Sequence, residues 1–259
     1  MKALIITILC VISAGCGAQY NASTEQEELL LYSTEREVRL GRAIAKRIEK
    51  DPGIIHDADS LKRLDAIGQK IALVSERQDL TYHFDILNDT KDVNAMALPG
   101  GYVYVTKALL DAVANDDELA SVLAHEVAHI AARHSVKKLQ AALGYSILRI
   151  VTATAGDARV SRDTDIAFGQ IMLGYSREDE LFADKTGALY AKEAGYDPKA
   201  MVAFLEKLRD INKKLPIRPK SYARTHPYIS DRIRVVKEAT ENRIDFDDYI
   251  NTEDKESHE

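Results

Sequence analysis

The residues best suited to chemistry in this chain are His125, Glu126 and His129, which lie in the sequence His-Glu-Val-Ala-His. Residues four apart on a helix lie one turn above each other, so the two imidazoles can hold one metal ion from the same side. The glutamate between them can serve as a general base beside that ion. This residue pattern is the signature of a zinc site that activates water for hydrolysis.

A helix must present these side chains, and the sequence predicts one over about residues 115–143. Asn115 is a suitable N-cap, and Glu118 three residues later can reach back to the cap. An apolar stripe beside the histidines would bury the helix; it consists of Leu119, Leu123, Val127 and Ile130. The helical context favours metal binding over two histidines that merely pack.

A catalytic zinc site has three protein ligands and one open position, so a third ligand is needed. A metzincin would have Gly and His where this chain has Ala132 and Ser135, and that class is excluded. His134 follows His129 by five residues, about 140° round a continuous helix. We therefore expect His134 to be a surface residue that points away from the metal.

A better candidate for the third ligand lies in a second segment, where Glu180 and Asp184 are again four residues apart. A helix there would present both carboxylates on one face, one toward the metal and one behind it. Asp184 suits the second role, because metal-bound imidazoles commonly donate their other N–H to a carboxylate. Taken alone, such a pair is more typical of a solvated acidic face.

Three segments resemble the motifs of one known protein family. They are residues 125–129, residues 176–184, and Thr225-His226-Pro227 followed by Arg232. Together they resemble the HtpX and CAAX prenyl protease family of zinc metallopeptidases, which is metallopeptidase family forty-eight, over about residues 33–238. The likeness is closest to compact bacterial lipoprotein and periplasmic members. It implies one Zn²⁺ per chain; its ligands would be His125, His129 and Glu180, with Asp184 behind them and Glu126 as the base.

The resemblance also draws attention to His226 and Arg232. In the family this histidine lies near the metal, where it occupies the open coordination position or stabilises the developing oxyanion, and the arginine lies close by. The sequence leaves open whether His226 blocks the site or assists it. Without the family, His226-Pro227 would be a turn at a helix entry with an incidental imidazole.

We expect a mainly helical α+β fold of the gluzincin type, with a small antiparallel sheet. Strands are predicted at residues 80–87, which alternate in polarity, and after the turn signal at Pro99-Gly100-Gly101. The segment 94–101 resembles the family's edge strand, against which substrate is expected to pair, so Asn94 and Ala95 are candidate substrate contacts. An ordinary hairpin explains this segment equally well. Other helices are predicted from a capping box at Thr34 and Glu37, and over about 59–77, 178–194, 198–212 and 230–240.

The N-terminal segment indicates location. A basic residue, an apolar run and small residues before Cys16 form a secretory signal that is too short to be a membrane span. The sequence Ile-Ser-Ala-Gly-Cys resembles a bacterial lipoprotein cleavage box, which implies removal of residues 1–15 and lipidation of Cys16. The residue after this cysteine is Gly17 rather than Asp, which resembles lipoproteins that are sorted to the outer membrane. The alternative is an ordinary cleaved signal.

Composition and charge set the domain plan. We expect a tether over residues 16–32, one peptidase domain over 33–240 and an acidic tail over 241–259. The net charge of -6 makes nucleic acid an improbable partner. No apolar run within 144–175 is long enough to span lipid, and we expect a helical hairpin there that covers the site as a lid.

These observations predict a zinc-dependent endopeptidase that is anchored to the outer membrane and faces the periplasm. Its expected partners are unfolded or misfolded envelope proteins, the membrane lipid and the outer-membrane assembly machinery. One alternative is a chaperone or assembly factor whose zinc site is kept latent by His226. Another is a purely structural zinc, against which Glu126 beside the metal argues.

Overall fold

The computed structural model describes residues 17–30, 32–50, 53–147, 169, 173–214 and 225–241. The expected signal peptide, Cys16, nearly all of the expected acidic tail and most of the expected lid lie outside the described residues. Within the described part, helices predominate and the strands form two small sheets, which confirms the expected mainly helical α+β class. None of the described helices has the length and apolar character of a membrane span.

The first sheet is an antiparallel hairpin of β1 (Gly17–Asn21) and β2 (Gln26–Leu30). Our prediction of an irregular tether did not foresee this hairpin. Its polar residues have specific partners: Asn21 Nδ2 and Thr24 Oγ1 donate to the Glu28 carboxylate over 3.1 and 2.7 Å, and Lys137 pairs with the same carboxylate. Hydrogen bonds and an ion pair of its side chains therefore stabilise this polar hairpin, and a search for apolar periodicity does not detect such contacts.

The second sheet has three strands in the order β3 (His83–Leu87), β5 (Tyr102–Thr106) and β4 (Ala95–Leu98). β4 pairs antiparallel with β5 and lies at the edge, as expected, whereas β3 pairs parallel with β5. The sheet is therefore mixed. After β3 the chain crosses to the far edge and forms β4, and it then turns back to form β5 between the two. Gly100 and Gly101 make that turn at φ +77 and +96, values that favour glycine.

The sheet separates two hydrophobic clusters. One face contributes Phe84, Ile86 and Val103 to the main core, together with residues of α3 (Ala58–Val74) and α5 (Asp116–Ala131). The other face contributes Tyr102 and Tyr104 to a smaller cluster under α2 (Thr34–Ile48). Alternation along the strands thus serves two buried faces, which fixes the sheet rigidly beneath α5.

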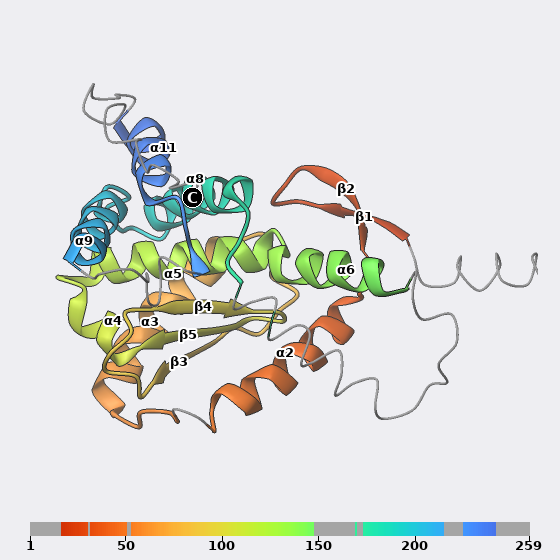
Figure 1. Cartoon of the computed structure of the whole chain (residues 1–259), viewed down its shortest axis with the longest axis horizontal. Helices are drawn as coiled ribbons and strands as arrows, with labels where there is room; N and C mark the ends of the chain where they lie inside the picture. The colour runs from red at the N-terminus through yellow and green to blue at the C-terminus, as the bar shows by residue number, and fades with distance from the viewer. Residues whose placement is uncertain are drawn as a thin grey trace, which may run out of the picture.

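The central helix α5 follows the short α4 (Lys107–Ala112) and lies between the sheet and the C-terminal helices (Figure 1). Asn115 caps it by accepting from the Glu118 backbone N–H at 2.9 Å, as predicted. The Glu118 carboxylate reaches back to the Ala114 N–H, one residue before the cap. Every residue from Glu118 to Ala131 is buried, so the motif lies in the interior.

The predicted helix over 115–143 is wrong in one respect, because it is two helices. α5 ends at Ala131, and α6 (His134–Ile147) begins after Arg133, which has a φ of 56. A left-handed residue cannot continue a right-handed helix, so the phase of the side chains changes at this point. Nothing in the sequence marks the break, because it contains no Gly or Pro.

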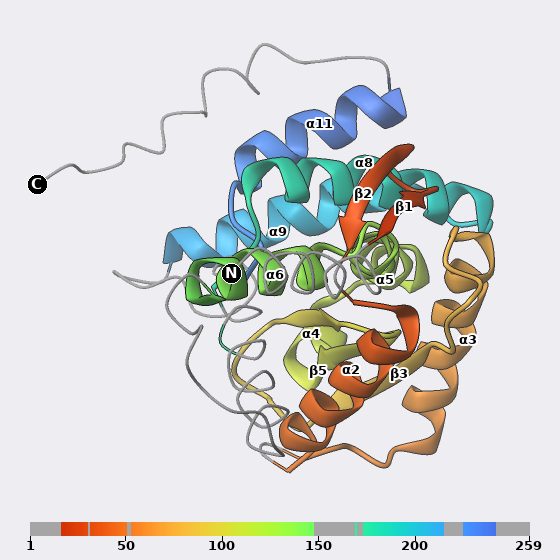
Figure 2. The same ribbon diagram turned by 90° about the vertical axis from the view of Figure 1, so that its right-hand side faces the viewer.

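The C-terminal helices are α8 (Arg177–Glu193), α9 (Ala200–Lys214) and α11 (Ile229–Glu241), each within about two residues of its prediction. Figure 2 shows them on one side of α5, with the sheet and α2 on the other. α8 packs closely on α5 at Gly187, where an added Cβ would lie 2.9 Å from the His125 backbone nitrogen. The approach of these two backbones brings the two predicted ligand segments together.

Candidate metal centre

Helix α5 places the three residues of the motif in the interior. His125, Glu126 and His129 are at most 1% exposed. The Nε2 atoms of the two histidines lie 3.0 Å apart, so both rings direct the same nitrogen toward one point. This is the arrangement that the four-residue spacing predicts.

Helix α8 brings Glu180 to the same point. Ser176 and Asp179 form a capping box that starts this helix. Glu180 Oε2 lies 3.5 Å from His125 Nε2, and Oε1 lies 3.4 Å from His129 Nε2. One carboxylate from a second helix therefore faces both imidazoles, as a third ligand must.

Asp184 lies one turn further along α8, behind His125. Its Oδ1 is 2.8 Å from His125 Nδ1, the nitrogen that faces away from the shared point. Arg232 of α11 donates from Nε and Nη2 to the two oxygens of Asp184 over 2.8 Å each, and its Nη1 lies 3.1 Å from Glu180 Oε2. The buried guanidinium thus holds both carboxylates in place.

His226 reaches the same centre from the segment before α11. Its Nδ1 lies 3.0 Å from Glu180 Oε1 and 3.3 Å from His125 Nε2, and its Nε2 lies 3.3 Å from Glu126 Oε1. Ligand atoms of His125, His129, Glu180 and His226 all lie within 4.8 Å of one another. The structure therefore offers four donors to one ion, one more than the three expected ligands.

The charges of the centre depend on one another. Burial raises the pKa of Glu180, but His226 and Arg232 outweigh it and hold this pKa well below its usual range. The pKa of Asp184 is likewise lowered, because Arg232 and His125 outweigh its burial. Both acids are therefore carboxylates at neutral pH, the form in which one can bind a cation and the other can accept a hydrogen bond.

The two candidate ligand histidines differ in protonation. Burial holds the pKa of His129 well below its usual value. Burial and Arg232 also lower the pKa of His125, but Asp184 and Glu180 outweigh both and raise it to about 9. A ligand imidazole must be neutral at the nitrogen that binds, so metal binding at this centre releases a proton from His125.

The residues present fit a zinc ion. Two imidazole nitrogens and one carboxylate are a known catalytic zinc set. Within the described part of the chain, both oxygens of Glu126 are buried without a hydrogen-bond donor. Buried carboxylate oxygens without donors are costly, and a divalent cation with its water would offset that cost.

The expectation for His134 is wrong. It is 4% exposed, and its Nδ1 lies 2.7 Å from Nδ1 of His129. The reason is the break at Arg133, which turns the first residue of α6 back toward the site. Burial lowers the pKa of His134 to about 4, so the ring is neutral. The sequence also gave no sign of Tyr175, whose ring stacks on His129 with centroids 3.9 Å apart.

The two candidate substrate residues lie beside this centre but are buried. Ala95 is fully buried and Asn94 is 8% exposed. Asn94 Oδ1 accepts from Thr225 Oγ1 at 3.1 Å, which ties the start of β4 to the segment that carries His226. Their contact with substrate remains a prediction.

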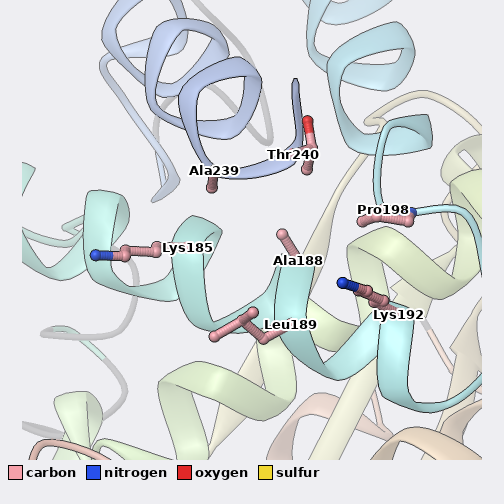
Figure 3. Close-up of a pocket in the computed structure, with 7 residues that line it drawn as sticks. All are labelled: Lys185, Ala188, Leu189, Lys192, Pro198, Ala239 and Thr240. Carbon is pink, nitrogen blue, oxygen red and sulfur yellow. The ribbon is translucent and has the colours of Figure 1, made fainter. Parts of the chain in front are cut away.

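A separate cavity of about 200 Å³ lies on the outward face of α8, next to α11 (Figure 3). Its lining is mainly aliphatic with two lysines; it consists of Lys185, Ala188, Leu189, Lys192, Pro198, Ala239 and Thr240. Glu180 and Asp184 lie on the inward face of the same helix and are fully buried. The metal centre and this cavity are therefore on opposite sides of α8.

Comparison with known proteins agrees with this geometry. The family model for peptidase family M48 matches residues 59–240. The β-barrel assembly-enhancing protease of Escherichia coli K12 is 28% identical over 212 residues, which cover 78% of this chain and 43% of the relative. The mitochondrial metalloendopeptidase OMA1 of Schizosaccharomyces pombe is 31% identical over 170 residues, which cover 66% of this chain and 50% of the relative. The chain spans about half, or less, of the length of these relatives. It belongs to peptidase family M48.

Proposed function

We propose that this protein is a lipid-anchored endopeptidase of the bacterial envelope that hydrolyses unfolded or misassembled envelope proteins. The observation that supports this most is the meeting of His125, His129 and Glu180 at one buried point beside Glu126. A structural zinc site needs no base beside its ligands. An acid without hydrogen-bond donors at this point is explained by a hydrolytic role.

The residues divide the work of peptide hydrolysis. Zinc, when bound, polarises the scissile carbonyl and activates water. Glu126 takes the proton from the attacking water and hands it to the leaving amine, because its buried carboxylate accepts no hydrogen bond from the described residues and lies 3.3 Å from His226 Nε2. Arg232 acts as a positioning residue, since its guanidinium is engaged with Glu180 and Asp184.

A chaperone or assembly factor with a latent zinc site is the second candidate. The observation that favours it is the position of His226, whose two ring nitrogens face Glu180 and Glu126. In this arrangement the imidazole takes the place that a water molecule and a substrate carbonyl would need. The same geometry serves an endopeptidase that is released when the segment of His226 moves.

Location rests on other evidence. The sequence around Cys16 resembles a lipoprotein cleavage box, and this residue lies outside the described part of the chain. One group of relatives carries the name β-barrel assembly-enhancing protease, and β-barrels are the spanning proteins of the outer membrane. We therefore place the protein at the outer membrane facing the periplasm, with assembly machinery and misfolded outer-membrane proteins as partners.

The test compares wild type with Glu126→Gln on casein and on a panel of unfolded outer-membrane proteins, with zinc present or chelated. We expect wild type to cleave only with zinc, and the variant to bind one zinc but cleave about 10²- to 10⁴-fold more slowly, the contribution of a general base. Glu118→Gln is the matched control, because it changes the same residue type at the start of the same helix and should cleave normally.

The outcomes separate the two candidates. Full turnover by Glu126→Gln would remove Glu126 from its proposed role. Binding of unfolded protein by both forms with cleavage by neither would favour the chaperone. Wild type that contains no zinc and binds none would contradict both candidates.

A further inference from the structure

The two candidate ligand histidines are supported in different ways. Each directs Nε2 toward the shared point and turns Nδ1 away from it. Behind His125, Nδ1 meets the Asp184 carboxylate. Behind His129, Nδ1 meets another imidazole, His134, at 2.7 Å. A carboxylate is a common partner for a metal-bound histidine, whereas a second histidine needs a defined tautomer to fill that place.

The contact between the two Nδ1 atoms determines where the protons lie. Two ring nitrogens at 2.7 Å share a hydrogen bond only if one is protonated and the other is not. His129 must keep Nε2 free for a cation, so its proton lies on Nδ1 and is donated. His134 Nδ1 is therefore the acceptor, and the proton of the neutral His134 ring lies on Nε2.

The remaining N–H of His134 also has a partner. Its Nε2 lies 3.3 Å from Asp179 Oδ1. Asp179 is itself fixed by the start of α8, because its backbone N–H donates to Ser176 Oγ at 3.1 Å and its Oδ2 accepts from the Ser176 N–H at 3.3 Å. The next residue is Glu180. The contacts behind His129 thus return to the helix that supplies the third candidate ligand.

We propose that His134 and Asp179 are positioning residues that hold the candidate ligand His129 in one tautomer and one orientation. The path runs from His129 Nδ1–H to His134 Nδ1, and from His134 Nε2–H to Asp179 Oδ1. It rests on the proposed function, since it assigns His129 to the metal. Tyr175 stacks on the ring of His129 and fixes its plane, but stacking does not select which nitrogen carries the proton.

The backbone explains why this residue is available. Arg133 adopts φ 56, which is unusual for a residue with a side chain. A continuous helix would have carried His134 away from His129. The left-handed conformation of Arg133 therefore places the His134 ring where its Nδ1 can accept a hydrogen bond from His129.

The test measures zinc affinity by competition with a chelator in wild type, His134→Phe and His134→Asn. Phenylalanine keeps a ring but removes the acceptor, and we expect zinc to bind about 10- to 100-fold more weakly. The Oδ1 atom of asparagine lies near the place of Nδ1, so His134→Asn should recover most of the affinity. Leu139→Ala is the control; it removes buried apolar atoms from the same helix and should lower stability without weakening zinc binding.

A second measurement does not depend on any variant folding. Nitrogen-15 spectra of the imidazoles in wild type, without metal and with zinc, report which nitrogen of His129 carries the proton. We expect the proton on Nδ1 in both states. A proton on Nε2 without metal, or unchanged zinc affinity in His134→Phe, would overturn the proposal, as would a His134→Asn protein no better than His134→Phe. Wild type that binds no zinc would contradict the proposed function, while the spectrum would still decide the tautomer.

Discussion

Among the described residues, two buried ionic clusters differ in organisation. One is the metal centre. The other joins Glu37, Arg77 and Asp79, and we call it the Glu37 cluster. Glu37 is 1% exposed, and its two oxygens accept from Arg77 Nη2 and from the Gly100 N–H over 3.2 Å each. Arg77 Nε donates to Asp79 at 2.8 Å. This cluster ties α2 to the loop after α3 and to the turn between β4 and β5.

The two clusters differ in what is left unpaired. In the Glu37 cluster both oxygens of the buried glutamate have donors, and the unpaired atom is a donor, Arg77 Nη1, which no cation could satisfy. In the metal centre the atoms without a hydrogen-bond donor are the two carboxylate oxygens of Glu126, next to the His226 ring. Burial of charge alone therefore does not identify a functional site. A candidate metal site is identified instead by buried acceptors that lack donors and lie next to histidine nitrogens.

The largest expected effect is at Glu180. Glu180→Ala removes the ligand supplied by α8, so zinc affinity should fall more than about 100-fold, beyond the loss typical of residues that only support a ligand. Cleavage should be lost with it. The protein should remain folded, because Arg232 keeps both hydrogen bonds to Asp184. Zinc content of the purified variant and its circular dichroism spectrum test this; a full complement of zinc would exclude Glu180 as a ligand.

Glu37 should show the opposite behaviour. Glu37→Ala leaves Arg77 buried with less compensation and removes the acceptor of the Gly100 N–H, so we expect a loss of about 3 kcal/mol in the free energy of unfolding, the low end for a broken buried pair because Asp79 remains. Zinc affinity per folded molecule should not change. Urea unfolding and chelator competition measure the two quantities. If zinc affinity fell as stability did, the two clusters would be coupled and the comparison would fail.

A double variant sharpens the result at Glu37. Glu37→Ala leaves the Arg77 guanidinium without its buried partner, and adding Arg77→Met removes that charge. The free energy of unfolding should therefore partly recover, as it does when whole buried ion pairs are replaced by apolar side chains. We expect no such recovery at the candidate metal centre, where the acceptors would serve a cation.

Within each helix of the metal centre the pairing of residues was predictable from the sequence, because that spacing is local, whereas His226 and Arg232 were found only through the resemblance to the family. His125 and His129 are one turn apart, and so are Glu180 and Asp184, so each pair shares a helix face whatever the rest of the fold does. What the spacing could not give was the meeting of the two helices. That depends on the close packing at Gly187, a contact between distant parts of the chain.

The Glu37 cluster was not predictable, because its contacts are long-range. The sequence placed Thr34 and Glu37 in a capping box. In the structure Ser33 is the N-cap and accepts from the Arg36 N–H, while Glu37 points inward to Arg77, 40 residues away. The local sequence pattern predicted that Glu37 caps the helix, but its contact with Arg77, which is distant in the sequence, determines where its side chain lies.

Two other differences have the same origin. The break at Arg133 carries no Gly or Pro, so no local signal separates α5 from α6, and the position of His134 follows from that break. The parallel pairing of β3 with β5 depends on which strands meet, which alternation of polarity does not encode. The helices themselves were found because the periodicity of apolar residues is a local property.

The smallest expected effect concerns Asp79, the exposed end of the Glu37 cluster, whose side chain is 47% exposed. Its pKa is lowered from 3.8, because hydrogen bonds from Arg77 and Thr34 outweigh its burial. A carboxyl with a lowered pKa in the folded state adds stability above its unfolded pKa and loses it as pH falls through the folded pKa. Asp79→Asn should therefore be less stable than wild type at pH 7, by less than about 1 kcal/mol for so exposed a pair.

The difference between wild type and Asp79→Asn should shrink as pH falls below the unfolded pKa of Asp, about 3.9, and be lost as pH falls through the lowered folded pKa, because both side chains are then neutral. Urea unfolding of both proteins across this range measures it. Zinc affinity at pH 7 should be equal in the two, because the Asp79 carboxylate contacts Arg77 and Thr34 and no residue of the metal centre. A difference that does not shrink at all as pH falls below 3.8 would show that the Asp79 carboxylate contributes through shape rather than charge.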